Sequence, residues 1–275
     1  MYPPFRGRSD LLPSEILSLV NELRRRHGVP EVRYANTGVA QYRANYMLRE
    51  KLFNHYDRQG LPPFYYFAIH GNYFYSEEAI GYVQFRNYPE HMVEEAVRGI
   101  IMDMVYRDAD SGWGHRDTLL DPCFNYGDVG LARDRNYVYV DVTMVSAWIQ
   151  WASPPRVKDN MFHAKGKVFH MVPERVTLFR AEVSERNLEK RSYDLGEPIA
   201  MVLPEPYYVR GIETIRPKTW RMGQELELEF RLPKFQGLVS VVISGKDLRN
   251  VRWNPMTPKQ VGECNLLCYP VLMQG

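Results

Sequence analysis

Apolar residues recur at helical spacing in three segments of the first half of the chain. The first runs from Ser14 to Gly28, the second covers residues 38–53, and the third follows Pro89 and covers residues 92–105. In each segment the apolar residues stand three or four positions apart, which places them on one face of a helix. We therefore predict three amphipathic helices, the first with Ser14 as its N-cap and Gly28 at its end.

After the third helix, apolar and polar residues alternate and no longer recur at helical spacing. Residues 129–132 and 137–145 are predicted strands, and residues 134–136 form a predicted hairpin turn between them. Further along, short extended runs are separated by Pro and Gly. These runs are 167–172, 175–183, 199–203, 225–232 and 238–244. In residues 225–232 apolar and charged side chains alternate, so that one face lies in the core and the other in water. This pattern predicts an antiparallel β-sandwich of the immunoglobulin-like kind.

The length of the chain indicates two domains. A chain of 275 residues is long for one core, because single cores stop growing beyond about 250 residues. The helical and the extended patterns meet in a stretch that contains paired prolines. We predict an α+β fold with a mixed domain over residues 1–150, a linker at 151–164 and an all-β domain over 165–275.

Charge and hydropathy exclude two classes of protein. With 35 basic against 33 acidic side chains, the formal net charge of +2 is too small for a field that attracts nucleic acid. The basic run from Arg24 to Arg26 lies at the predicted end of the first helix, where it complements the helix dipole. No apolar stretch reaches the roughly 18 residues of a transmembrane helix, and the first residues lack a signal-peptide pattern. We expect a cytosolic protein or the mature form of an exported one.

Three cysteines are too few for a disulfide framework. Cys123 follows a turn and is expected to pack like a small apolar side chain. Cys264 and Cys268 stand four positions apart, close enough for a bridge if the chain bends between them. At least one thiol has no intramolecular partner, and the cysteine count leaves the redox compartment open.

Residues 61–75 combine Pro and Gly, which interrupt regular structure, with seven aromatic side chains. We expect an irregular loop whose aromatic rings pack down beneath it. The alternative is an aromatic wall that grips an apolar ligand or a sugar. Aromatic packing beneath a long loop is the commoner arrangement, so we favour it.

Five polar side chains of the first domain are candidates for one site. They are His55, Glu77, Glu78, Asp103 and His115. Neutral imidazole nitrogen and carboxylate oxygen suit a zinc-like divalent ion, which can activate a bound water for hydrolysis. The alternative is a metal-free cluster held by hydrogen bonds. The spacing of these residues does not decide between a metal site and a hydrogen-bonded cluster, because the residues lack the i, i+4 pairing of a helical metal motif.

Several short motifs resemble, in order, the signatures of prokaryotic CAP domains, the fold of the cysteine-rich secretory proteins, antigen 5 and the plant pathogenesis-related proteins. The motifs are Asn21-x-x-Arg24-x-x-x-Gly28, Phe53-Asn54-His55, Glu78-Ala79-Ile80-Gly81, Gly114-His115-Arg116-Asp117-x-Leu119-Leu120-Asp121-Pro122 and Val129-Gly130-Leu131-Ala132. The resemblance covers residues 12–146. It implies an α-β-α sandwich and an extracellular setting.

The resemblance also implies a shallow cleft with four polar residues. His55, Glu78 and His115 match three of the four cavity positions of the family. Many relatives carry a Glu three residues after a Trp on the third helix. Here Asp103 takes the place of that Glu without the Trp, so the fourth carboxylate is shorter. Glu77 replaces Glu78 at the cleft if the strand register slips by one residue.

The function that this resemblance implies is binding. We predict a secreted or surface-exposed CAP module joined to a β-sandwich, which binds a divalent cation such as Zn²⁺, an apolar, glycan or lipid ligand, or another protein. One alternative is a metal-dependent hydrolase of peptide or ester bonds, with His55 and His115 as metal ligands and Glu78 as general base. Another is a structural component of a surface assembly that self-associates through exposed strand edges.

Overall fold

The computed structural model describes residues 11–86, 92–205 and 211–273, and it divides into two compact units. The first unit comprises Met1–His55, Glu77–Val145 and Arg252–Val261, and the second comprises Tyr56–Ser76, Ser146–Val251 and Gly262–Gly275. Each unit is therefore built from segments that are not consecutive in the chain. The predicted linker at 151–164 is wrong, because these residues lie in strands β5 (Ile149–Lys158) and β6 (Met161–Val168).

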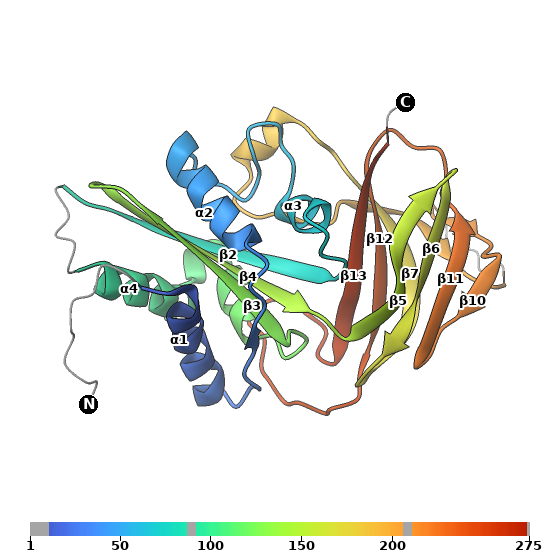
Figure 1. Ribbon diagram of the computed structural model, residues 1–275, viewed down its shortest axis with the longest axis horizontal. Coiled ribbons are helices and arrows are strands. Elements are labelled where there is room, and N and C mark those ends of the chain that lie inside the picture. The colour runs from blue at the N-terminus through green and yellow to red at the C-terminus, as the bar shows by residue number, and fades with distance from the viewer. Residues whose placement is uncertain (1–10, 87–91, 206–210, 274–275) are drawn as a thin grey trace. The chain divides into compact units, whose positions relative to one another are not determined.

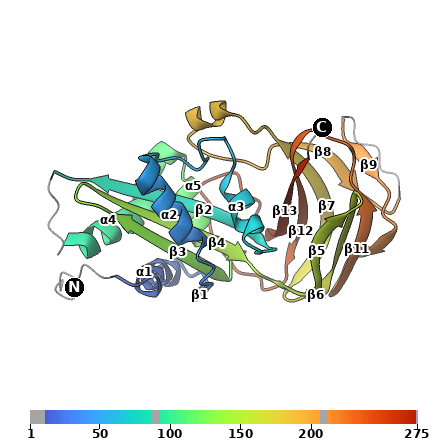
Figure 2. The ribbon, with the colours of Figure 1, turned by 45° about the horizontal axis from the view of Figure 1, so that its top comes forward.

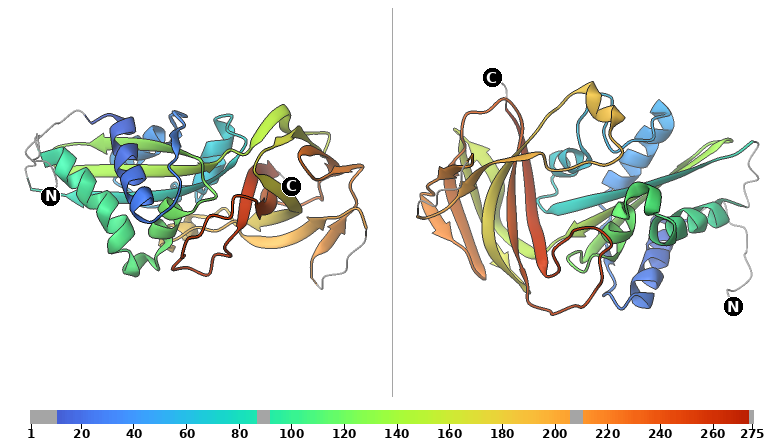
Figure 3. Two further views of the ribbon diagram at one scale, coloured as in Figure 1. Left: turned by 90° about the horizontal axis from the view of Figure 1, so that it is seen from below. Right: turned by 180° about the vertical axis from the view of Figure 1, so that it is seen from behind.

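The first unit is an α-β-α sandwich around a four-stranded sheet (Figure 1). The sheet has the order β1-β3-β4-β2, with β1 at Arg33–Tyr34, β2 at Tyr75–Gln84, β3 at Tyr126–Arg133 and β4 at Tyr137–Ser146. Helices α1 (Pro13–Arg26), α4 (Val93–Tyr106) and α5 (Gly114–Leu120) contact one another on one face, and α2 (Val39–Glu50) covers the other (Figure 3). The three predicted helices and the predicted hairpin are confirmed.

Two glycines of the sequence motifs let helices close onto this sheet. A Cβ atom on Gly130 in β3 would lie 2.1 Å from the carbonyl oxygen of Ala40 in α2. A Cβ atom on Gly81 in β2 would lie 2.4 Å from the side chain of Ile100 in α4. Both separations are shorter than any real carbon contact, so only glycine permits these helix positions. The close approach at Gly81 sets the distance between α4 and β2.

Helix α1 begins two residues earlier than predicted, with Leu12 as its N-cap. Pro13 occupies its first turn, and the Glu15 carboxylate accepts a hydrogen bond from the backbone N–H of Leu12 at 2.9 Å, so Ser14 is not the N-cap. At the other end, Arg24 does more than complement the helix dipole, because its side chain is fully buried. It donates hydrogen bonds to the carbonyl oxygens of Pro30, Leu119, Asp121 and Phe124. The last turn of α1 is thereby fastened to the chain around the end of α5.

The second unit contains two sheets (Figure 2). Their orders are β10-β11-β6-β5 and β13-β12-β7-β8-β9. The remaining strands are β7 (Met171–Ala181), β8 (Glu197–Val202), β9 (Glu213–Ile215), β10 (Thr219–Arg221), β11 (Glu225–Arg231), β12 (Gly237–Asp247) and β13 (Glu263–Met273). Phe162 of β6 packs edge-on against Tyr269 of β13 with ring centroids 5.8 Å apart, so apolar side chains of the two sheets meet.

The all-β character of the C-terminal region is confirmed, with one difference in pairing. β8 and β9 pair in parallel, whereas we predicted antiparallel pairing throughout. Strands β5, β9, β10 and β13 and most of β6 were not predicted. The predicted run 167–172 covers the end of β6 and the start of β7. The immunoglobulin-like kind of sandwich stays a prediction.

The aromatic segment at 61–75 is more regular than predicted. It contains helix α3 (Pro63–Ile69), in which Pro63 occupies the first turn and does not interrupt the helix. Phe64 of this helix is buried and packs in a cluster with Leu238. This ring therefore belongs to the core of the second unit, as the packing interpretation predicted.

The cysteines pair differently from the prediction. Cys123 and Cys264 are disulfide-bonded, and Cys268 is a free, buried thiol. A bridge between Cys264 and Cys268 is therefore wrong. Burial raises the pKa of the Cys268 thiol to about 12, so this side chain behaves as a small apolar residue.

Candidate functional site

Three of the predicted site residues meet in the first unit. His55 follows α2, Glu78 lies on β2, and His115 is the second residue of α5. The ring centroids of the two histidines are 6.0 Å apart, and Nδ1 of His55 lies 2.8 Å from Oε2 of Glu78. The motifs thus identified residues from three separate elements that the fold brings together.

Glu78 is a buried carboxylate whose charge is matched by Arg43 of α2. Nε of Arg43 donates a hydrogen bond to Oε1 of Glu78 at 2.8 Å, and both side chains are almost fully buried. Arg43 also donates to the backbone carbonyl of His55 at 2.7 Å. Burial alone would raise the pKa of Glu78, but Arg43 and His55 together lower it to about 2. Glu78 is therefore ionised at neutral pH, and it orients the His55 ring.

A second buried carboxyl group, Asp141 of β4, contacts Glu78. Burial and the adjacent charge of Glu78 raise the pKa of Asp141 well above its ordinary value. Oδ1 of Asp141 accepts a hydrogen bond from the Thr143 hydroxyl at 2.9 Å, whereas no N–H or hydroxyl group of the described residues reaches Oδ2. The raised pKa favours the protonated form of Asp141, in which the carboxylic acid can donate a hydrogen bond to Glu78. The cluster thus contains one guanidinium and two carboxyl groups at one buried site.

His115 is held by a carboxylate that the sequence did not single out, Asp108. Nδ1 of His115 lies 2.7 Å from Oδ1 of Asp108, and Oδ2 of Asp108 accepts a hydrogen bond from the backbone N–H of Arg116 at 3.0 Å. Asp108 is buried. It stands seven positions before His115 in a segment without helical spacing, so no pattern marked it. Each imidazole is therefore oriented by its own carboxylate.

Glu77 faces away from the histidines, because neighbouring residues of a strand point to opposite sides. Its two carboxylate oxygens accept hydrogen bonds from Nζ of Lys259 at 3.0 and 2.7 Å. The Thr118 hydroxyl donates to it at 2.8 Å, and Lys259 also contacts Asp121 at 3.1 Å. Glu77 is thus part of an ion-pair network, and Glu78 is the residue that meets His55.

Lys259 belongs to a segment that we call the return segment, residues 252–261, which connects β12 to β13 in sequence and is part of the first unit. The backbone N–H groups of Met256 and Thr257 donate to Oδ2 of the buried Asp117 at 2.8 and 2.6 Å. Asp117 is the aspartate of the Gly-His-Arg-Asp motif. Its role is to fasten α5 to the return segment, which supports the helix that carries His115.

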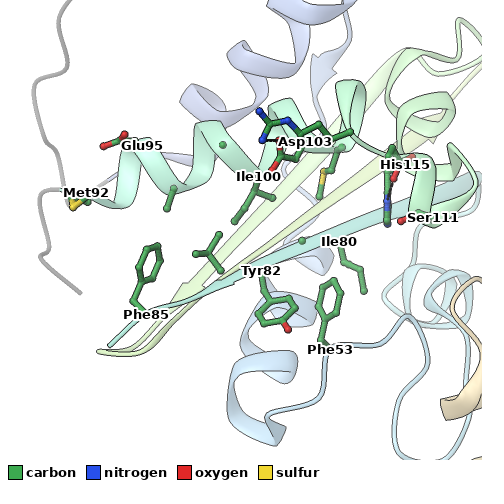
Figure 4. A pocket seen from close by; sticks show the side chains of 17 residues that line it. Phe53, Ile80, Tyr82, Phe85, Met92, Glu95, Ile100, Asp103, Ser111 and His115 are labelled. Carbon is green, nitrogen blue, oxygen red and sulfur yellow. Dashed lines mark hydrogen bonds and ion pairs between the residues drawn. The ribbon is translucent and has the colours of Figure 1, made fainter. Parts of the chain in front are cut away.

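A groove of about 460 Å³ lies between α4 and β2 (Figure 4). His115 and Ser111 lie at one end, and Phe85 and Met92 lie at the other (Figure 4). The apolar part of the lining consists of Phe53, Ile80, Gly81, Tyr82, Val83, Phe85, Met92, Ala96, Gly99, Ile100 and Met104. A cavity of this size, apolar with a few polar groups, is typical of a ligand-binding site.

Asp103, the predicted fourth cavity residue, lines this groove from α4. Its side chain is 57% exposed and pairs with Arg107 of the same helix at 3.5 Å. An exposed pair of this kind contributes at most about 1 kcal/mol. Asp103 is therefore a weakly held carboxylate at the polar end of the groove.

Gly99 in the middle of α4 is not explained by packing. A Cβ atom at this position would meet no atom within 4 Å. Glycine in a helix interior costs about 1 kcal/mol relative to alanine, so the fold would gain from a side chain here. Gly99 lines the groove, and the absence of a side chain keeps the groove open.

The carboxylates do not complete a metal site. The Glu78 carboxylate is engaged by Arg43 and by His55. Within residues 11–86, 92–205 and 211–273, no three His, Cys, Asp or Glu side chains are arranged to hold a metal ion. Zinc sites in proteins use three or four side-chain ligands. The divalent-cation centre at His55 and His115 stays a prediction.

A family model matches the N-terminal half of the chain. Residues 17–148 match the family model described as CAP, cysteine-rich secretory protein family. An extracellular protein containing a SCP domain from Bacillus anthracis str. Ames is 18% identical with a TM-score of 0.35, over 50% of this chain and 44% of that chain. The CAP domain of Enterococcal PrgA is 14% identical with a TM-score of 0.37, over 56% of this chain and 70% of that chain. This chain thus spans less than half of the Bacillus structure. No curated protein matches it.

Proposed function

Because residues 17–148 of this chain are a CAP domain of the cysteine-rich secretory protein family, we propose that the protein is an extracellular binding protein whose ligand occupies the groove between α4 and β2. The observation that carries this proposal is the groove, which is apolar along α4 and polar at the end where His115 lies. Such a lining favours a ligand with an apolar body and a polar group at one end.

The charged side chains that line the groove indicate which kind of polar group the ligand carries. Glu95, Asp103 and Asp108 contribute carboxylates, and Arg107 contributes a guanidinium. This balance favours a cation or a hydrogen-bond donor over an anion. The ligand that we propose is therefore apolar with a cationic or donor group near Asp103.

The cysteines support the extracellular setting. Disulfides persist in oxidising compartments and are rare in the cytosol. Cys123 and Cys264 are disulfide-bonded, and the matching family is described as secretory. No described helix is long and apolar enough to cross a membrane. The disulfide and the description of the matching family support our proposal that the protein lies outside the cell or on its surface.

The alternative of a metal-dependent hydrolase has weaker support from the same residues. Its general base would be Glu78, and a general base works best when its pKa is near the operating pH. The pKa of Glu78 is about 2, because Arg43 and His55 stabilise its charge. Glu78 is suited to holding His55 and is poorly suited to taking a proton.

A fluorescence titration with 1-aminoanthracene, a small fused aromatic amine, tests the proposal. We expect saturable binding to the wild type and at least about tenfold weaker binding to Gly99→Leu, a loss of about 1.4 kcal/mol, because the leucine fills the groove. Gly223→Leu is the matched control, since a Cβ atom there also meets nothing within 4 Å and the residue lies outside the groove. No binding to the wild type, or equal binding to Gly99→Leu, would contradict the proposal.

A further inference from the structure

The groove follows the edge of a strand. β2 is the outer strand of the four-stranded sheet, where its neighbour is β4. Ile80, Gly81, Tyr82 and Val83 are consecutive residues of β2, and all four line the groove. Successive side chains of a strand point to opposite faces. Four consecutive lining residues therefore place the groove along the backbone edge of β2.

Backbone groups on this edge face the groove. The backbone N–H of Phe85 donates to the carbonyl of Asn136 at 2.7 Å, at the end where β2 meets β4. Backbone N–H and C=O groups of a strand alternate in direction, so every second residue from 80 to 83 directs its groups away from β4. Among the described residues, β4 is the one strand that pairs with β2, and Tyr82 on this edge is 43% exposed.

We infer that the occupant of the groove is an extended peptide segment with apolar side chains and one basic residue, which pairs with β2 as an added strand and packs against α4. This inference rests on the proposed function and names its ligand class. A free strand edge binds an extended peptide through main-chain hydrogen bonds, and the adjacent pockets select alternate side chains. Here α4 supplies the wall that receives those side chains.

The length of the α4 wall agrees with a short peptide. The part of the chain that lines the groove from α4 runs from Met92 to Arg107 and spans about 22 Å at 1.5 Å per residue. An extended peptide of about seven residues covers the same length at about 3.3 Å per residue. Gly99, near the middle of this wall, leaves room for a side chain of the peptide.

Asp103 is the reason why we include a basic residue in the proposed peptide. This carboxylate is more than half exposed, and its pair with Arg107 on the same helix contributes little. A Lys or Arg side chain of a peptide in the groove would meet Asp103 at the polar end. A lipid or a small aromatic ligand would use the apolar lining but would make no hydrogen bonds to the strand edge, which separates these occupants experimentally.

The test is fluorescence anisotropy with a labelled peptide of about seven residues that alternates Val or Phe with Thr and carries one Lys. We expect saturable binding to the wild type and to Gly223→Leu, and at least about tenfold weaker binding to Gly99→Leu. N-methylation of alternate peptide amides then probes the strand pairing. Peptides methylated at the amides that face β2 lose these hydrogen-bond donors, so we expect their affinity to fall about tenfold or more. Peptides methylated at the amides that face away from β2 should bind like the parent peptide.

Equal affinities of the two methylated series would overturn the strand pairing. Replacing the peptide lysine by glutamine should weaken binding to the wild type several-fold and leave binding to Asp103→Asn unchanged; the same loss in both proteins would overturn the basic residue. If 1-aminoanthracene binds the groove and the peptide does not displace it, the proposed function stands and the peptide inference fails. If neither probe binds, both fail. Self-association that Gly99→Leu abolishes would replace the peptide by a second copy of the chain.

Discussion

The two histidines of the first unit are held alike but lie in different surroundings. Nδ1 of His55 lies 2.8 Å from Glu78, and Nδ1 of His115 lies 2.7 Å from Asp108. The His55 side chain is 9% exposed and has a buried guanidinium behind its carboxylate, whereas the His115 side chain is 18% exposed and lines the groove. Sequence motifs mark both histidines. The more buried His55 supports the fold, whereas His115 can contact a ligand in the groove.

The strongest way to test this comparison is Arg43→Met. The substitution leaves the Glu78 charge buried without its partner, which we expect to lower the free energy of unfolding by about 3–5 kcal/mol. Arg49→Met on the same helix is the control, because the Arg49 side chain is 61% exposed and its loss should change stability by at most about 0.5 kcal/mol. Urea unfolding at neutral pH measures both. A loss below about 1 kcal/mol for Arg43→Met would show that the His55 side is not a structural centre.

The return segment offers a smaller effect on the His115 side. Burial alone would lower the pKa of Lys259, but Glu77 and Asp121 raise it above 10.5, so Lys259 is charged at neutral pH. We expect Lys259→Met to cost about 1.5–3 kcal/mol in urea unfolding, because two carboxylates lose their charged donor. The contribution is complete below pH 10.5 and is lost as the pH rises toward the folded-state pKa, so the difference from wild type should narrow there.

Lys165→Met is the matched control for this variant, because the Lys165 side chain is 52% exposed in its pair with Glu227. We expect it to change stability by at most about 1 kcal/mol. Equal losses for Lys259→Met and Lys165→Met would remove the return segment from the support of α5.

Asp141 is expected to have a smaller effect on stability, and this effect depends on pH. The folded-state pKa of Asp141 is raised, so the unfolded chain loses a proton above pH 3.8 that the folded chain keeps, and wild-type stability falls as the pH rises. Asp141→Asn is neutral at every pH and keeps the donor to Glu78. We expect its Tm to rise relative to wild type between pH 4 and 7 by about 2–4 °C, equivalent to about 1 kcal/mol.

Asp134→Asn should behave in the opposite direction. A hydrogen bond from Lys51 lowers the pKa of Asp134 in the exposed hairpin turn, so its contribution to stability is present above pH 3.8 and is lost in acid. Scanning calorimetry at several pH values measures both variants. A Tm difference for Asp141→Asn that does not change with pH would show that no buried proton is shared.

The smallest expected effect is that of zinc. Calorimetric titration of metal-stripped wild type and of the His55→Ala, His115→Ala double variant should show no saturable one-to-one binding at micromolar zinc, because the carboxylates of both histidines are already engaged. Saturable binding to the wild type that disappears in the double variant would contradict this reasoning. It would also make the metal-dependent hydrolase the better proposal.

Periodicity predicted those elements that bury one face and expose the other. The helices of the first unit and strand β11 are of this kind, because their apolar residues share one face. β5 escaped notice because Pro154 and Pro155 are typical of a linker. It lies at the end of its sheet, where a missing N–H removes no ladder bond on the open side.

The sequence by itself determined which residue types stand at the site, because the motifs around His55, Glu78 and His115 are local patterns. Tertiary structure alone decided their partners. It placed Asp108 against His115, a contact that no motif indicated. It also closed the cluster with an arginine from α2 and tied α5 to a segment more than a hundred residues later in the chain. The physical reason is that short-range patterns encode which face of an element is buried, whereas hydrogen bonds and ion pairs between distant residues depend on how those buried faces pack.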